Sequence, residues 1–118
     1  MKPSRFTNCE YDLRQLTMEQ ERAEVERCWR NVHYCDGSYQ GYPRGTILIL
    51  YGPNNRSDFD SWHAAYLYTV EHAEKVKEVR EEITWLKSLN HVTHMNAAIR
   101  TLRRAEVELD NLLRGWKG

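Results

Sequence analysis

The sequence predicts a mainly α-helical fold, in which two long helices form an antiparallel hairpin beside a short N-terminal helix and a small β element. Apolar residues recur at three- and four-residue steps over residues 57–89 and again over 93–114. Gly and Pro concentrate in residues 33–56, where they interrupt any helix. A chain of 118 residues is long enough for one core, so we expect a single helical-hairpin domain spanning 1–118.

The composition is that of a soluble globular protein. Apolar residues make up 41% of the chain and charged residues 29%, and 17 basic residues balance 17 acidic ones. Nucleic-acid binders usually carry a basic excess, so this balance disfavours that class without excluding it. The longest apolar stretch, 47–51, is too short to span a bilayer, and residues 1–8 lack a secretory signal. An odd number of cysteines, three, argues against a disulfide framework, so we expect a cytoplasmic protein without a membrane partner.

The first helix is predicted over residues 18–32. Thr17 and Gln20 have the spacing of a capping box, in which each side chain accepts a hydrogen bond from the other residue's backbone N–H. The residues that follow place their apolar members on one helical face, formed by Met18, Val25, Cys28, Trp29 and Val32.

Residues 46–51 are the clearest strand candidate, because they are apolar on both faces and are bounded by Gly45 and Gly52. A single strand cannot satisfy its own backbone hydrogen-bonding groups, so it needs a partner strand. The candidates are residues 39–42, the N-terminal segment, or the same strand in a second protomer.

The second helix is predicted to begin at Ser57, whose hydroxyl would cap it, with Asp58 and Asp60 in the first turn. Its apolar stripe has the spacing of a coiled-coil seam and consists of Trp62, Ala65, Thr69, His72, Val76, Val79, Ile83 and Leu86. Residues 59–70 are apolar on all sides, which places them in the globular body. Residues 74–88 are apolar only along the stripe, which is typical of a projecting arm.

Asn90 is expected to end the second helix and Thr93 to begin the third, although one unbroken helix is the alternative. The third helix has an apolar stripe from Met95 to Trp116, and Gly115 ends it. A hairpin this thin would leave the seam residues of the arm, Val76, Val79, Ile83 and Leu86, partly uncovered. We therefore expect a homodimer or another protein to cover them.

No residue pattern predicts a metal site, a cofactor or catalysis. Cys9, Cys28, His33 and Cys35 lack the paired spacing of zinc ligands, and Cys35 beside His33 lacks an activating helix N-terminus. His72 is expected to be a hydrogen-bonded core histidine, and His91 and His94 to lie in solvent near the hairpin tip.

Aromatic residues carry the leading functional hypothesis. Trp85 lies off the apolar stripe among polar residues, so we expect it to be exposed as a binding anchor. Gly, Pro, Ser and Asn surround four tyrosines, a mixture typical of recognition loops, although the rings could equally cover the base of the core: Tyr34, Tyr39, Tyr42 and Tyr51. The sequence thus favours a non-enzymatic protein–protein interaction module, such as a small adaptor or a phage-encoded inhibitor.

Two alternatives stay open. The face of the third helix opposite its apolar stripe carries Arg100, Arg103, Arg104 and Arg114, which could follow the phosphates of a nucleic acid. The simpler explanation is a solvated face that pairs with the acidic second helix. The other alternative is a small ligand-binding protein or enzyme with a pocket between the Tyr-rich segment and Trp62 or His63.

Overall fold

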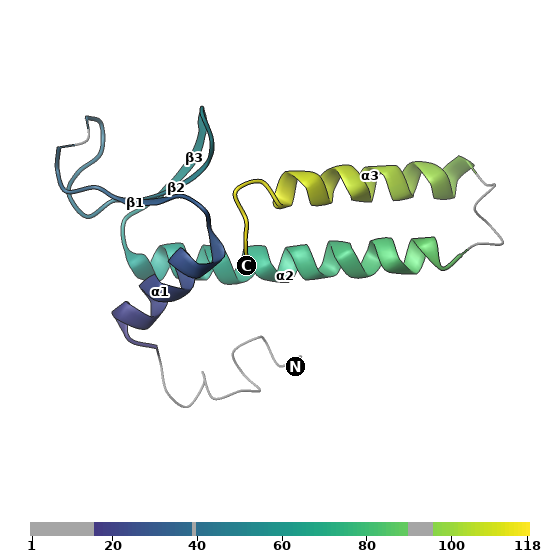
Figure 1. The fold of residues 1–118 in the computed structure, drawn as a ribbon, viewed down its shortest axis with the longest axis horizontal. Coiled ribbons are helices and arrows are strands. Elements are labelled where there is room, and N and C mark those ends of the chain that lie inside the picture. The colour runs from purple at the N-terminus through teal and green to yellow at the C-terminus, as the bar shows by residue number, and fades with distance from the viewer. Residues whose placement is uncertain (1–15, 39, 90–95) are drawn as a thin grey trace.

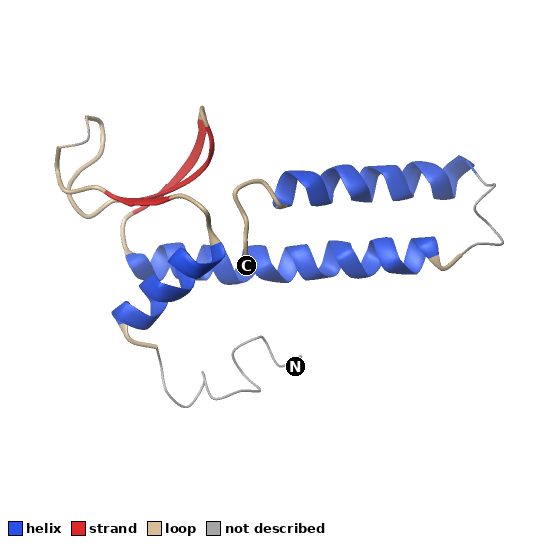
Figure 2. Ribbon diagram, in the orientation of Figure 1, coloured by secondary structure: helices blue, strands red, loops and turns tan. Residues whose placement is uncertain are grey.

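The computed structural model describes residues 16–38, 40–89 and 96–118. Within these ranges, three helices accompany a three-stranded antiparallel sheet with the strand order β1-β2-β3 (Figures 1 and 2). The elements in chain order are α1 (Met18–Cys28), β1 (Val32–Tyr34), β2 (Ile47–Gly52), β3 (Asn55–Phe59), α2 (Trp62–Lys87) and α3 (Asn96–Leu112). The fold is mixed α/β, so the prediction of a mainly α protein is correct for the helices and underestimates the sheet.

The predicted hairpin is confirmed, because α2 and α3 run antiparallel and side by side (Figure 1). An unbroken rod through residue 90 is therefore wrong. The arm has its own apolar cluster, in which Val79, Ile83 and Leu86 of α2 pack against Ala105 of α3. The small side chain of Ala105 lets the two helices approach closely along this seam.

The expectation that the seam stays uncovered is wrong. Val76, Val79, Ile83 and Leu86 are all buried within the single chain. The apolar stripe of α3 covers the last three, and Val76 joins the larger core cluster at the base of the hairpin. These four residues consequently give no reason to require a second protomer.

The start predicted for the second helix, Ser57, is also wrong, because residues 55–59 form β3 instead. Ser57 is paired with Ile49 of β2, and α2 begins only after Ser61, whose Oγ accepts a hydrogen bond from Ala64 N at 3.1 Å. The backbone groups of β2 need partners on both sides, and this requirement outweighs the helix-capping pattern around Ser57.

On its other side β2 pairs with β1, where Val32 lies opposite Ile49. The partners of β2 are thus neither residues 40–42 nor a second protomer. Residues 29–32 also leave the predicted first helix for this reason, so that α1 ends at Cys28 and Trp29 is extended.

At the start of α1, the capping box between Thr17 and Gln20 is confirmed.

Trp29 lies at the centre of the core and joins four parts of the chain. It is 1% exposed, and its Nε1 donates a hydrogen bond to Thr69 Oγ1 of α2 at 3.0 Å. Its ring contacts four other rings at centroid distances of 4.7 to 5.8 Å, those of Tyr51, Tyr68, His72 and Trp116. We call these five rings the Trp29 cluster.

The segment after α3 folds back onto the body of the protein. Arg30 N donates to Gly115 O at 2.8 Å, and Lys117 N donates to Cys28 O at 2.8 Å, which satisfies a carbonyl at the end of α1. Gly115 has φ +74°, and a Cβ added there would lie 3.2 Å from Leu50 O and from the Cα of Tyr51. Glycine is therefore needed for this close approach to β2.

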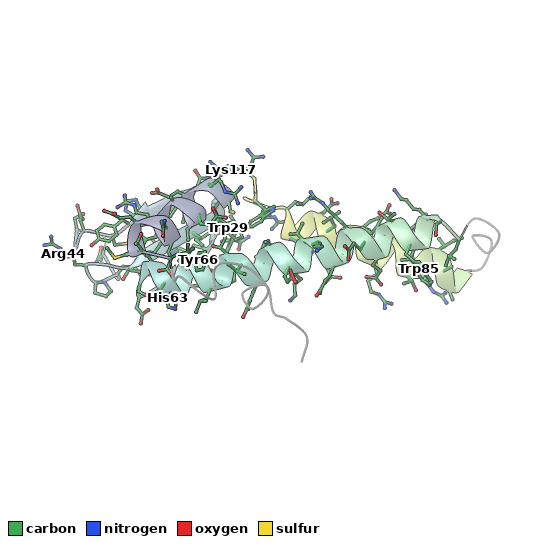
Figure 3. All side chains as sticks on the ribbon, turned by 90° about the horizontal axis from the view of Figure 1, so that it is seen from below. Trp29, Arg44, His63, Tyr66, Trp85 and Lys117 are labelled. Atoms are coloured by element: carbon green, nitrogen blue, oxygen red, sulfur yellow. The ribbon has the colours of Figure 1, made fainter. Side chains whose placement is uncertain are left out.

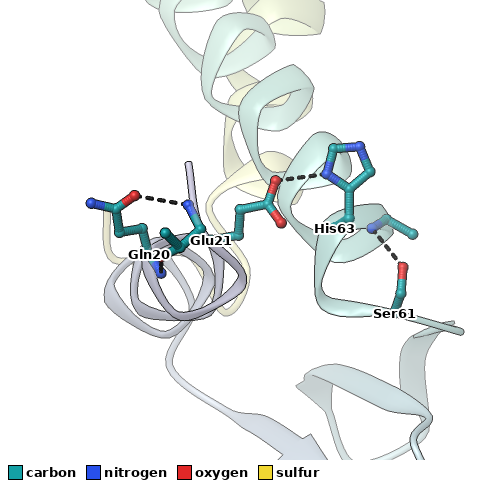
Figure 4. Close-up of polar contacts among 6 residues, drawn as sticks. Gln20, Glu21, Ser61 and His63 are labelled. Atoms are coloured by element: carbon teal, nitrogen blue, oxygen red, sulfur yellow. Dashed lines mark hydrogen bonds and ion pairs between the residues drawn. The ribbon is translucent and has the colours of Figure 1, made fainter. Parts of the chain in front are cut away.

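A polar contact joins α1 to α2. Glu21 Oε2 lies 2.6 Å from His63 Nδ1, and the glutamate is only 8% exposed (Figure 4). The contact gives the buried carboxyl group its hydrogen-bond partner. Figure 4 also shows the nearby caps of both helices, Gln20 at the start of α1 and Ser61 at the start of α2.

Replacing Trp29 with Ala should lower the free energy of unfolding by about 3–5 kcal/mol, because it empties the centre of the core. Urea denaturation followed by circular dichroism measures this loss. Trp29→Phe should cost less, since it keeps a ring while removing the hydrogen bond to Thr69. A loss below about 1 kcal/mol for Trp29→Ala would contradict the central position of this residue.

Burial lowers the pKa of His72, and the nearby charge of Lys75 lowers it further, against the opposing effect of its hydrogen bond to Leu112 O. In the unfolded chain His72 has its ordinary pKa of 6.5, so as the pH falls it takes up a proton there before it does so in the folded protein. Acidification therefore favours unfolding. The melting temperature should decrease as the pH is lowered from about 7.5 to about 5.5, and the decrease should be smaller in His72→Gln than in the wild type. An equal fall in both proteins would show that His72 does not contribute.

Candidate functional site

An open groove runs along the side of α2 that α3 leaves free. We call it the α2 groove; its volume is about 640 Å³. It is lined by one helical face of α2 and by the end of the chain, through Ala73, Val76, Lys77, Arg80, Glu81, Thr84, Trp85, Ser88, Trp116 and Gly118. The groove therefore extends from the Trp29 cluster, which contains Trp116, toward the outer end of the arm.

Trp85 stands at the outer end of the α2 groove. Its side chain is 61% exposed, and it projects from α2 near the hairpin end of the molecule (Figure 3). Trp85 immediately precedes the seam residue Leu86, so its position is turned by about 100° from the seam. The predicted exposure of Trp85 is confirmed, and its role as a binding anchor remains a prediction.

The tyrosines do not join Trp85 in one surface. Tyr34 is 44% exposed and stacks on the buried Trp62 at a centroid distance of 6.3 Å. The hydroxyl of Tyr42 accepts a hydrogen bond from Arg56 Nε, whereas Tyr51 is half-buried in the Trp29 cluster. Tyr39 lies outside the described residues. The sheet that carries Tyr34 and Tyr51 is at the opposite end of α2 from Lys87 (Figure 1).

A second hollow lies beside Tyr51, with a volume of about 320 Å³. Its lining residues come from β2, β3, α2, α3 and the turn after α3, and they are Tyr51, Asn55, Arg56, Tyr68, His72, Asn111 and Arg114. We call it the cationic pocket, since it holds two arginines and no carboxylate among these residues. Beside the predicted pocket, Trp62 stacks on Tyr34 and His63 contacts Glu21, and a pocket between the Tyr-rich segment and these two residues stays a prediction.

The predicted arginine face is divided between two places. Arg100, Arg103 and Arg104 are exposed on α3, and Arg114 lies in the turn that follows Leu112. The turn places Arg114 in the same pocket lining as Tyr51. The pocket therefore combines one residue of the predicted arginine face with one of the four predicted tyrosines. Arg56 and Asn111 were not predicted as site residues, because they are far apart in the sequence and line one pocket only in the folded chain.

The cysteines are placed where they react poorly. Cys28 and Cys35 are buried free thiols, and burial raises the pKa of both, with the carboxylate of Asp36 raising that of Cys35 further. Among residues 16–38, 40–89 and 96–118, no group of three His, Cys, Asp or Glu side chains could hold a metal ion. Cys9, His91 and His94 lie outside these ranges.

No helix in the described part of the chain has both the length and the apolar character that crossing a membrane requires. Comparison with known proteins gave no match to a family model, a curated protein or a solved structure.

Proposed function

We propose that this protein is a non-enzymatic interaction module, an adaptor or inhibitor that docks a helix of a partner protein in the α2 groove. The observation that carries the proposal is the 61% exposure of Trp85 at one end of a groove whose other end is the core residue Trp116. Large aromatic side chains in such positions are common anchors of protein interfaces.

The groove continues a surface that the protein already uses for helix packing. A smaller hollow between the end of α1 and α2 shares Ala73, Lys77, Trp116 and Gly118 with the α2 groove. The groove therefore begins where α1 stops covering α2, as the arrangement of the two helices in Figure 1 illustrates. A second helix that follows α1 along the same face would extend an established mode of packing.

The dimensions and chemistry suit an amphipathic helix. From Ala73 to Ser88 the groove follows α2 for roughly 22 Å, enough for about four turns of a docked helix. Ala73, Thr84 and Ser88 are small enough to allow close approach, and Lys77, Arg80 and Glu81 offer charges of both signs at the rim. The partner helix should therefore present apolar residues to the floor and mixed charges beside them.

Replacing Trp85 with Ala should weaken partner binding by about 30-fold or more, because burial of an exposed indole stabilises an interface by roughly 2–4 kcal/mol. The melting temperature should stay unchanged, since Trp85 is largely outside the core. Isothermal titration calorimetry with the purified partner, first captured from the native host, measures the change in affinity.

The matched control is Val107→Ala, which trims a residue that is 59% exposed on α3 and outside the α2 groove. It should bind the partner as the wild type does. Equal affinity of all three proteins would refute the docking site, and so would unfolding of Trp85→Ala. The alternative occupant of the α2 groove is a second copy of this chain. Sedimentation of the chain alone tests it, because self-association that is lost in Trp85→Ala would mean that a second copy fills the groove.

A further inference from the structure

We propose that the cationic pocket binds a phosphate monoester group between Arg56 and Arg114. This proposal is independent of the α2 groove, because the two lining sets share no residue. It assigns a ligand site to the base of the hairpin, where the turn after α3 meets the sheet.

The charges of the pocket favour an anion. Its two cationic side chains, Arg56 and Arg114, face a lining without Asp or Glu. Within residues 16–38, 40–89 and 96–118, neither arginine forms an ion pair. Guanidinium groups present paired N–H donors that match the oxygens of a phosphate, so two of them can hold one phosphate from two sides.

Arg56 is held in place by Tyr42. Its Nε donates a hydrogen bond to the Tyr42 hydroxyl at 2.8 Å, and its guanidinium lies 5.8 Å from the centre of that ring. This arrangement uses only the Nε–H of the guanidinium. In the part of the chain that the structure describes, neither terminal nitrogen of Arg56 has a hydrogen-bond or ion-pair partner, so both can form the fork that binds oxyanions.

A chain of hydroxyl groups adds a neutral donor. Tyr51 Oη lies 2.7 Å from Ser57 Oγ and 2.7 Å from Tyr68 Oη. When Ser57 donates to Tyr51 and Tyr51 donates to Tyr68, the proton of Tyr68 is left to donate to a ligand oxygen. Burial raises the pKa of Tyr51 well above its usual range, so the Tyr51 hydroxyl keeps its proton and can donate to Tyr68.

The backbone builds the pocket without a ligand. The β2–β3 register shifts between Leu50 and Gly52, and such irregularities commonly redirect a side chain, here that of Tyr51. Gly115 then brings the chain against Leu50 and Tyr51, which fixes the backbone next to Arg114. A site whose parts are already in position loses little entropy when the ligand binds.

The size of the pocket selects the ligand class. A volume of about 320 Å³ is near the lower limit for ligand pockets and exceeds what a single phosphate ion fills. Asn55 and Asn111 supply amide groups that can bind hydroxyl or ring nitrogen atoms. We therefore assign a phosphate monoester of nucleotide size, either a free nucleoside monophosphate or the phosphorylated 5′ end of a nucleic acid.

The test is calorimetric titration of the intact chain at low ionic strength with inorganic phosphate, adenosine monophosphate, and a short single-stranded DNA with or without a 5′ phosphate. We expect saturable binding of the monophosphate, weakened about tenfold or more by Arg114→Gln or Arg56→Gln. The matched control is Arg104→Gln, which removes the same charge from α3 outside the pocket and should change affinity less than about twofold.

The probes distinguish the two sources of phosphate. Tight binding of the monophosphate alone identifies a free nucleotide, whereas a preference for the 5′-phosphorylated strand, lost in Arg114→Gln, identifies a nucleic-acid end. No binding of any probe at millimolar concentration would overturn the proposal. So would equal losses in Arg104→Gln and Arg114→Gln, which would point to nonspecific attraction along α3. Circular dichroism checks folding, and Arg56→Gln replaces Arg114→Gln if the latter unfolds.

Discussion

The burial of Trp29 is the constraint on which the other parts of this structure depend. An eleven-residue helix is too short to be stable alone, and the sheet, with strands of 3, 6 and 5 residues, needs a covering layer for its apolar face, so both depend on a shared core. Trp29 provides it by contacting Tyr51 of β2, bonding to Thr69 of α2 and packing against Trp116 after α3. Because Trp116 must return to this point, the same core determines the inner end of the α2 groove and the position of Arg114 in the cationic pocket.

Much of the helical architecture could be predicted because it follows from local periodicity. The spacing of Val79, Ile83 and Leu86 marks the seam, and the same spacing places Trp85 outside it. The strand β3 could not be predicted this way, since Ser57 and its acidic neighbours have a composition typical of a helix start. Its conformation depends instead on the backbone groups of β2, which is a tertiary requirement. The cationic pocket is equally nonlocal, because Arg56 and Arg114 are 58 positions apart in the sequence and line one pocket where Gly115 approaches β2.

A net charge of zero conceals a clear separation of chemistry over the surface. The α2 groove combines apolar side chains with charges of both signs, which suits a protein helix, whereas the cationic pocket has only positive charge, which suits a small anion. Both sites draw on the end of the chain, because Arg114 lines the cationic pocket and Trp116 and Gly118 line the α2 groove. Several aromatic residues near the sheet pack in the core, among them Trp29, Trp62 and Trp116, whereas Trp85 on the arm is exposed.

Of the four tryptophans, three are enclosed in the core and one is exposed to solvent. Trp29, Trp62 and Trp116 are at most 6% exposed, against 61% for Trp85. Quenching of tryptophan fluorescence by iodide, in the wild type and in Trp85→Phe, measures this division directly. We expect one readily quenched, red-shifted component that disappears in Trp85→Phe, while the shielded emission of the other three persists. Quenching that is the same in both proteins would contradict it.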